Sequence, residues 1–492
     1  MSGQVAEVLK GRTMSRFRWF AATCVGLLLL NSSPSAAEPP NVVLFVADDL
    51  GWMDLGCQGS SFYETPHLDR LAAQGMRFTN AYASCPVCSP TRASLQTGRW
   101  PQRTGVTDYI GAAQPAKWNR PTKLLPAPYN PQLELEEVSL AETLKTHGYA
   151  TLFAGKWHLG SEPFWPEHQG FDINRGGIDR GGPYGGKRYF SPYGNPRLTD
   201  GPEGEHIADR LAQECATFIE RHRDQPFFVN FCFYDVHTPL MAKESLRKKY
   251  EAKRTSDVSK AQKEWPKEGE RPVRQVQDHA VYAGMVETMD GAVGAVLAKL
   301  DELKLTDNTL VIFTSDNGGL STSEGWPTSN LPLRGGKGWL YEGGIRVPFI
   351  VRWPGVTKPQ STSDRVVVSP DIFPTVLDAA GLPKVDSAQD GVSFEPTLRG
   401  EEQPPRSASF WHYPHYGNQG GFPGAAVRDG NWKLIERYED HLLELYNLRD
   451  DLAEQSNLVE AHPDVVRKLK QQLDDWRDDV GAKYPTERTP AN

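Results

Sequence analysis

The chain has 492 residues, of which 38% are hydrophobic and 24% are charged, and its formal net charge is −8 at pH 7. An acidic chain lacks the basic field of a nucleic-acid binder, so we expect no nucleic-acid partner, although a locally positive site for a small anion remains compatible with this charge. The length exceeds what one hydrophobic core usually serves, which predicts a large domain with a smaller one.

The first 37 residues have the pattern of a secretory signal peptide. Three arginines precede the apolar run "WFAATCVGLLLL", and small residues surround the expected cleavage site near Ala37. The alternative is a membrane anchor, but the run is too short to span a bilayer comfortably. We therefore predict an exported protein, periplasmic or secreted, without a stable membrane span, whose mature chain begins near Glu38.

Four apolar runs are typical of strands in a parallel sheet, because they are continuous rather than alternating. Amphipathic stretches lie between them and carry helix signals, such as Thr65 and Pro66 before one helix, Gly75 after it and Gly148 after another. This alternation predicts an α/β fold that binds its ligand beyond the C-terminal strand ends. The runs are "NVVLFVADDLGW" (41–52), "YATLFAGKWHLG" (149–160), "PFFVNFCFYDVHTP" (226–239) and "NTLVIFTSDNGG" (308–319), with a long helix expected over about 278–303.

Each expected strand ends in side chains suited to chemistry. A single acid after a strand is more often a turn former or a helix cap than a ligand. Four such strand ends in one chain favour a shared site instead. The side chains are Asp48 and Asp49, Lys156 and His158, His237, and Asp316 and Asn317, in chain order.

The three aspartates and Asn317 offer only oxygen atoms as ligands. If Asp48, Asp49 and Asp316 converge, their charges must be neutralised, because unpaired buried charge is costly. Oxygen ligands without cysteine or histidine favour Ca²⁺ or Mg²⁺ over Zn²⁺. The alternative is that Asp49 and Asn317 only cap loops.

Several cationic or titratable side chains accompany these oxygens. Taken singly, each lysine or arginine is most often a surface charge and each histidine a structural residue. Together, beside a divalent cation, they would form a site for a tetrahedral oxyanion whose bridging oxygen is protonated as it leaves. The residues are Arg92, Lys156, His158, His237 and Lys337.

The stretch "YASCPVCSPTRASLQTGRW" (82–100) must supply the nucleophile, because the chain has neither a serine-elbow motif nor a Walker-type loop. Cys85 and Cys88 form a CxxC pair, but a thioredoxin-like setting is absent, and a zinc site would need a second ligand pair. Five cysteines remain after the signal peptide, an odd number, so at least one is free or is no longer a cysteine.

This stretch resembles the signature of the type I sulfatases, in which Cys-x-Pro-x-Arg followed by Thr-Gly-Arg directs oxidation of the cysteine to Cα-formylglycine. The match departs at Thr91, where serine is usual, and at Gln96, where leucine is common. The resemblance, to members of the arylsulfatase A and N-acetylgalactosamine-6-sulfatase type, continues in order through "ADDLG", "GKWHLG", "HTP", "SDNGG" and "LRGGKGWLYEGGIRVP". The matching signature residues are Cys88, Pro90, Arg92, Thr97, Gly98 and Arg99.

The resemblance implies the alkaline-phosphatase-like α/β sandwich, with a large, mostly parallel central sheet flanked by helices. We expect a catalytic domain over residues 38–400 and a small C-terminal α+β subdomain over 401–492. The alternating pattern over 425–448 indicates antiparallel strands, and residues 462–480 have the pattern of an amphipathic closing helix.

The resemblance also implies how the nucleophile works. Cys88, converted to formylglycine by a formylglycine-generating enzyme, would hydrate to a gem-diol that Arg92 stabilises and that attacks sulfur through one hydroxyl. His158 would deprotonate the second hydroxyl, so that sulfate is expelled and the aldehyde returns.

The remaining residues would bind the substrate and a metal ion. Lys156, Lys337 and His237 would hold the sulfate, and Lys337 or His237 would protonate the leaving alcohol. One Ca²⁺ would be held by Asp48, Asp49, Asp316, Asn317 and the oxygen at position 88, that is, the modified Cys88.

Two other functions remain open at this point. One is a phosphate or phosphonate monoester hydrolase of the same superfamily, although the chain lacks the extra histidine and aspartate ligands of a two-zinc site. The other is a non-catalytic sulfate-binding homologue in which Cys88 is never oxidised.

Two further segments bear on the substrate. The loop at 173–204 is rich in glycine and tyrosine, and "FWHYPHYGNQGGF" (410–422) is aromatic, so both could line a pocket for sugar rings, with His412 or His415 as a binding residue. We therefore predict a sulfated saccharide as substrate. The alternative is that Trp411 and Tyr413 belong to the core. The charged stretch 241–277 predicts a solvated helix or flap without chemistry.

Overall fold

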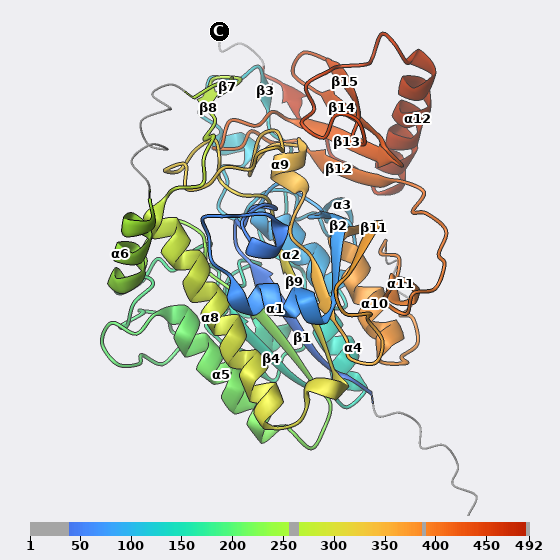
Figure 1. The fold of residues 1–492 in the computed structure, drawn as a ribbon. Helices are drawn as coiled ribbons and strands as arrows, with labels where there is room; N and C mark the ends of the chain where they lie inside the picture. Colours follow the sequence, from blue (N-terminus) through green and yellow to red (C-terminus); the bar gives the residue numbers. More distant parts are fainter. Residues whose placement is uncertain (1–38, 255–264, 386–389, 489–492) are drawn as a thin grey trace, which may run out of the picture. The chain divides into compact units, whose positions relative to one another are not determined.

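The computed structural model describes residues 39–254, 265–385 and 390–488, and Figure 1 shows its arrangement. Its centre is an eight-stranded sheet in which β9, β1, β6, β4 and β5 are parallel neighbours, while β10 runs antiparallel to β9 and β2. In sheet order the strands are β11 (Ser361–Val368), β2 (Met76–Tyr82), β10 (Ile350–Arg352), β9 (Thr309–Ser315), β1 (Asn41–Ala47), β6 (Phe227–Cys232), β4 (Ala150–Gly155) and β5 (Ile173–Arg175).

Helices cover both faces of the sheet (Figure 1). Successive residues of a strand point to opposite faces, so Val43 and Phe45 of β1 join one core and Val42 and Leu44 join the other. The first face carries α1 (Pro66–Gln74), α5 (Ile207–Arg221) and α8 (Ala280–Glu302), with α6 (Glu244–Lys253) against α8. The second carries α2 (Cys88–Thr97), α4 (Leu140–Thr146), α10 (Ile372–Ala379) and α11 (Glu395–Leu398), and α3 (Pro101–Thr104) follows α2.

The C-terminal part is an antiparallel sheet covered by one helix. It consists of β12 (Ser409–Tyr413), β13 (Gly424–Asp429), β14 (Trp432–Arg437), β15 (Leu443–Asn447) and α12 (Pro463–Asp479). Its core includes Tyr82 and Trp339, which both precede residue 400 in the chain, so the predicted boundary there stays a prediction. Further short elements include β3 (Leu124–Leu125), β16 (Thr486–Glu487), β7 (Lys267–Glu268), β8 (Arg271–Pro272) and α9 (Glu342–Ile345).

The predicted mixed α/β architecture is confirmed. The four expected strands, the long helix over 280–302, the antiparallel C-terminal strands and the closing helix are all present. Helix α1 begins after Thr65 as expected, but the Thr65 hydroxyl bonds Gly56 and Asp69 instead of capping the helix. Within the described ranges, no helix is both long and apolar enough to cross a membrane. The predicted signal peptide, residues 1–37, lies outside the described residues.

Candidate active site

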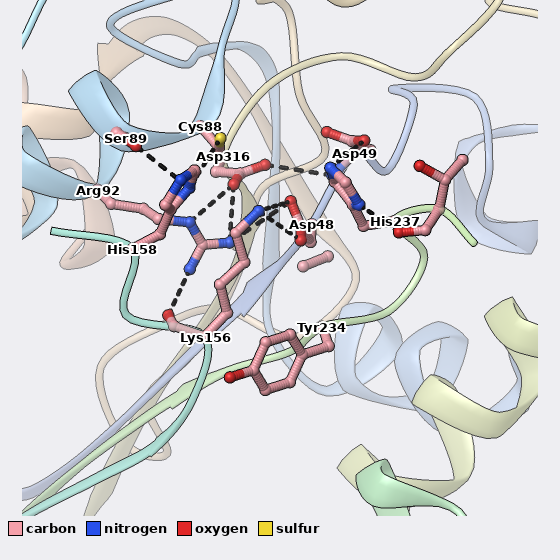
Figure 2. A network of polar contacts seen from close by, with 12 residues as sticks. Asp48, Asp49, Cys88, Ser89, Arg92, Lys156, His158, Tyr234, His237 and Asp316 are labelled. Carbon is pink, nitrogen blue, oxygen red and sulfur yellow. Dashed lines mark hydrogen bonds and ion pairs between the residues drawn. The ribbon is translucent and has the colours of Figure 1, made fainter. Parts of the chain in front are cut away.

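The parallel sheet brings the predicted strand ends together. Strands β9, β1, β6 and β4 are consecutive and parallel, so the residues that follow them meet at one edge of the sheet. Figure 2 shows the resulting network of polar contacts. The convergence predicted from the four apolar runs is thus observed for Asp48, Asp49, Lys156, His158, His237, Asp316 and Asn317.

Two of these residues have an unusual backbone conformation. Asp49 has φ of 61° and His158 has φ of 57°, in the left-handed region that side chains other than glycine rarely adopt. Strain of this kind is kept where the surrounding structure enforces it, most often at functional sites.

Cys88 is the first residue of helix α2, all of whose residues are buried. Arg92 lies four residues later and therefore on the same face of the helix. This spacing explains why the sequence pattern Cys-x-x-x-Arg serves one site: the helix presents the thiol and the guanidinium to the strand ends together. Both side chains are only 2–3% exposed.

Arg92 ties the helix to the strand ends. Its Nε and Nη2 both contact Asp316 Oδ2, at 2.9 and 2.7 Å, and its Nη1 donates to the Lys156 carbonyl at 2.8 Å. Burial opposes the charge on Arg92, but Asp316 and Asp48 outweigh it and raise the pKa of the guanidinium. Arg92 is thus a fixed positive charge that orients the region around position 88.

Two lysines balance the other carboxylates. Lys156 Nζ donates to both oxygens of Asp48, at 2.9 and 2.7 Å, and Lys337 Nζ contacts both oxygens of Asp49 at 2.8 Å. Although burial lowers the pKa of each lysine, the neighbouring aspartate raises it above the ordinary value. With Arg92, three cations therefore face three carboxylates in a buried cluster.

The hydrogen bonds of His158 define its tautomer. Nε2 lies 2.8 Å from the Ile110 carbonyl, which can only accept, so Nε2 carries the hydrogen. Burial, aided by Lys156, lowers the pKa of His158 to about 3, so the ring is neutral. Its Nδ1 lone pair is therefore free to accept a proton, and it faces Cys88 Sγ at 3.4 Å and Ser89 Oγ at 3.2 Å.

His237 is oriented in the opposite sense. Its Nδ1 donates to the Thr238 carbonyl at 2.6 Å, which leaves Nε2 toward Asp49 Oδ2 at 3.7 Å. Burial, together with the charge of Lys337, lowers its pKa to about 3. The ring is therefore neutral and presents Nε2 to the cluster.

The oxygen atoms at this edge fit a hard divalent cation. Asn317 Nδ2 donates to Asp49 Oδ1 at 2.9 Å, while Asn317 Oδ1 is buried without a hydrogen-bond partner among the described residues. An orphaned oxygen beside the carboxylates of Asp48, Asp49 and Asp316 is costly unless a cation or a donor meets it. Potential ligand atoms of Asp48, Asp49 and His237 also lie within 4.8 Å of one another. His237 is therefore a further possible ligand, which the sequence did not indicate.

A cavity of about 260 Å³ opens onto this cluster. Four predicted residues line it: Cys88, His158, His237 and Lys337. Lys156 does not, because its ammonium is fully buried against Asp48, so its contact with sulfate stays a prediction. Outside the segments predicted to line a pocket, three further residues line it that sequence reasoning missed: Tyr109, Ile110 and Glu324.

The two segments predicted to line a pocket each contribute to it, but not through the expected histidines. The loop at 173–204 supplies Gly181 and Tyr184, and the segment 410–422 supplies Asn418 and Gln419. Gly181 is needed for close packing, because a Cβ there would lie 2.7 Å from the His158 ring. Glu324 lies in an irregular loop between "SDNGG" and "LRGGKG". The sequence indicates its position only indirectly, in that both flanking motifs reach the site.

The structure does not bring His412 to the site, which corrects the prediction that it binds substrate. His412 is buried in the C-terminal sheet, where Tyr438 contacts its Nδ1 at 2.7 Å and the Lys483 carbonyl contacts its Nε2 at 2.9 Å. With both ring nitrogens occupied, it cannot contact a ligand in the cavity. Trp411 and Tyr413 are core residues, as the alternative interpretation held.

Comparison with known proteins places this geometry in a family. A family model described as sulfatase matches residues 40–382, and one described as the C-terminal part of N-sulphoglucosamine sulphohydrolase matches 336–479. A sulfatase of Formosa agariphila is 33% identical, covering 90% of this chain and 89% of its own. Human arylsulfatase A is 32% identical with the same coverage, and human N-acetylgalactosamine-6-sulfatase is 34% identical over 74% of this chain and 66% of its own.

Solved structures of known proteins have a similar fold. The crystal structure of Ps i-CgsB, also solved in complex with k-i-k-neocarrahexaose, has a TM-score of 0.73 with 27% identity, covering 89% of this chain and 93% of its own. The phosphonate monoester hydrolase of Agrobacterium radiobacter shares the fold, at a TM-score of 0.63 and 22% identity over 92% of this chain and all of its own. Since the sulfatase model matches most of the chain and full-length relatives exceed 30% identity, the chain belongs to the sulfatase family of hydrolases, in the alkaline phosphatase superfamily.

Proposed function

We propose that this enzyme hydrolyses sulfate monoesters of carbohydrates outside the cytoplasm, through a formylglycine made from Cys88 and with one bound Ca²⁺. The observation that carries the proposal is the position of Cys88, whose Sγ lies 3.4 Å from Nδ1 of a neutral histidine at the wall of a partly enclosed cavity. A nucleophile beside a positioned base is the arrangement that covalent hydrolysis requires.

His158 supports this role as the base. Oxidation to formylglycine would give position 88 an oxygen nucleophile in place of a thiol. His158 Nδ1 points at that position and is unprotonated at neutral pH, so it can take a proton from a hydroxyl there. The Ile110 carbonyl holds the other ring nitrogen and so keeps the reactive nitrogen aimed at residue 88.

The cations support binding of the sulfate group. Lys337 lines the cavity with a protonated ammonium, and His237 presents Nε2 beside it. Fixed charges in a site that excludes water stabilise developing negative charge better than mobile solvent does. We assign protonation of the leaving alcohol to Lys337, whose ammonium is charged, because His237 is neutral and its hydrogen is on Nδ1, away from the cavity. Lys156 and Arg92 would hold the charges around position 88.

The proposed calcium ion would be held by Asp48, Asp49, Asp316 and Asn317, together with the oxygen at position 88. When bound, it would supply a positive charge that polarises the ester and the nucleophile. Support comes from the unpartnered Asn317 oxygen and from the all-oxygen donor set, which favours calcium or magnesium over zinc. Among the described residues, His237 offers a nitrogen that could join them.

A saccharide substrate is supported by the cavity lining. Tyr109 and Tyr184 contribute aromatic rings, and Tyr184 is 53% exposed, so its ring is open to a ligand. Aromatic faces pack well against the C–H groups of sugars. The neighbour solved with a neocarrahexaose binds a saccharide in the same fold, which supports the same class of ligand here.

Rates on sulfate and phosphate esters of one aryl alcohol test the proposal. We expect kcat/KM on 4-nitrophenyl sulfate to exceed that on 4-nitrophenyl phosphate. The reverse order would indicate a phosphomonoesterase. Such enzymes usually need ligands for two zinc ions, whereas the described part of the chain contains one candidate group of metal ligands, Asp48, Asp49 and His237. Hydrolysis of neither ester, with an unmodified thiol at Cys88, would indicate a non-catalytic homologue.

A further inference from the structure

The catalytic cavity contains one acidic side chain that the hydrolysis of a sulfate ester does not require. Glu324 lines the cavity with the cationic Lys337. One carboxylate oxygen accepts from Gln419 Nε2 at 2.6 Å, and the other lies 3.4 Å from the Thr238 hydroxyl. Within the described ranges no cation lies at ion-pair distance from Glu324: Lys337 interacts with its charge across the cavity but is paired directly with Asp49.

The backbone around Glu324 is held in place. Glu324, Gly325 and Trp326 have φ of 51°, 91° and 46°, three consecutive residues in the left-handed region. Trp326 fixes the loop, because its Nε1 donates to the Pro272 carbonyl at 2.9 Å and its own carbonyl accepts from Arg274 Nη1 at 2.8 Å. Strain retained at a ligand cavity indicates that the position of this carboxylate matters.

A carboxylate in this place has two consequences for a ligand. An ionised carboxylate offers about four lone-pair directions, and Gln419 and Thr238 use two of them, so it can accept further hydrogen bonds from hydroxyl or ammonium groups. It also repels any second anionic group near the sulfate ester, because like charges in a partly enclosed cavity are poorly screened.

We propose that Glu324 makes this cavity specific for sulfate esters that carry a hydrogen-bond donor, and no second anionic group, beside the ester. This inference rests on the proposed sulfatase function and narrows its substrate to neutral or amino sugar monosulfates, excluding neighbouring sulfate or carboxylate groups. Glu324 is thus a specificity-determining residue that binds the part of the substrate that does not react.

Binding of simple aryl sulfates tests this without knowledge of the natural sugar. The probes are phenyl sulfates that carry an aminomethyl, a hydroxymethyl or a carboxylate group at the meta or para position. Their dissociation constants are measured by calorimetry on the full-length Cys88→Ala chain, which cannot turn them over by the proposed route. The same series is repeated with Glu324→Gln and Glu324→Asp added, and with Glu302→Gln, an exposed acid on α8, as the matched control.

We expect the parent chain to bind the aminomethyl probe most tightly and the carboxylate probe least. Glu324→Gln should reduce the ratio of these two dissociation constants about 10- to 100-fold, the range for one charge-assisted contact. Glu324→Asp should keep the order, and Glu302→Gln should leave the ratio unchanged. Equal binding of the probes by the parent, or an unchanged ratio in Glu324→Gln, would overturn the inference. Failure of the proposed function would show separately, as absent turnover of 4-nitrophenyl sulfate by the unmutated enzyme.

Discussion

His158 is the residue whose role is defined most sharply by its contacts. Because Nε2 is bound by the Ile110 carbonyl, only Nδ1 can act as a base toward position 88. We expect His158→Gln to lower kcat for 4-nitrophenyl sulfate by about 10²- to 10⁴-fold, the usual contribution of a general base, with a smaller change in KM. Steady-state kinetics beside the exposed His168→Gln control would measure this. A kcat within about threefold of the unmutated enzyme would argue against a base at His158.

For single residues, the sequence correctly predicted those site residues that directly follow strands. The C-terminal ends of neighbouring parallel strands meet at one edge of the sheet, independently of the conformation of the loops. Sequence prediction failed where position depends on irregular chain. Glu324 lies in a loop with no periodic pattern. Its place in the cavity depends on the hydrogen bond from Gln419 and on the bond from Trp326 to the Pro272 carbonyl, which fixes the loop. His412 was misassigned because an aromatic-rich stretch fits a pocket wall and a buried strand equally well.

Loop 173–204 positions the base through a glycine. Gly181 packs on the His158 ring, and a Cβ there would lie 2.7 Å from Cε1 and 2.9 Å from Nε2. We expect Gly181→Ala to displace the ring and lower kcat about 10- to 100-fold, since small misplacements of catalytic groups are costly. The matched control is Gly291→Ala in α8, where an added Cβ meets nothing within 4 Å. Normal kcat in Gly181→Ala would show that the ring position tolerates this contact.

Strand β14 is joined to helix α9 by a buried charge cluster. Lys433 Nζ contacts Glu342 at 2.9 Å and Glu454 at 2.8 Å, and all three side chains are fully buried. Burial raises the pKa of Glu454 to about 7, so Glu454 is ionised at pH 8 and protonated at pH 5. The folded state therefore binds the proton on Glu454 more tightly than the unfolded chain does. The stability gained from this protonation is fully present below about pH 4.5 and is lost as the pH rises through about 7.

We therefore expect Lys433→Met to destabilise the protein more at pH 8 than at pH 5. Removing the cation leaves the buried Glu454 carboxylate unpaired at pH 8, at a cost of about 3–5 kcal/mol, although Glu342 keeps Arg346 as a partner. Protonation of Glu454 relieves part of that cost at pH 5. Urea unfolding at both pH values would measure the difference, with the exposed Lys468→Met as control. An equal loss of stability at the two pH values would contradict the assigned charge states.

Element prediction succeeded for the same physical reason as site prediction. Strands β1, β6, β4 and β9 are covered on both faces, so their sequences are continuous apolar runs. Such runs can be recognised from the local sequence alone. Strands β2, β10 and β11 were missed: β10 has only three residues, and β2 and β11 have partly exposed residues in their patterns. Their pairing depends on contacts between distant parts of the chain, which local patterns do not encode.

For the whole molecule, the carboxylates at the sheet edge link metal binding to stability. A cation that binds only the folded chain stabilises it by about 2.7 kcal/mol at a concentration of 100 times its dissociation constant. We expect a chelator to lower the thermal midpoint and excess Ca²⁺ to restore it, by scanning calorimetry. Asn317→Ala, which removes the unpartnered oxygen, should reduce that shift. An identical midpoint with chelator and with Ca²⁺ would contradict a calcium site here.

The central claim is that the side chain at position 88 reacts as an oxidised cysteine. Mass spectrometry of the tryptic peptide 78–92, taken from a preparation that hydrolyses 4-nitrophenyl sulfate, tests it most directly. We expect that residue 88 has lost its sulfur and gained a carbonyl oxygen, while Cys85 in the same peptide keeps its thiol. An active preparation in which Cys88 is entirely an unmodified thiol would contradict it.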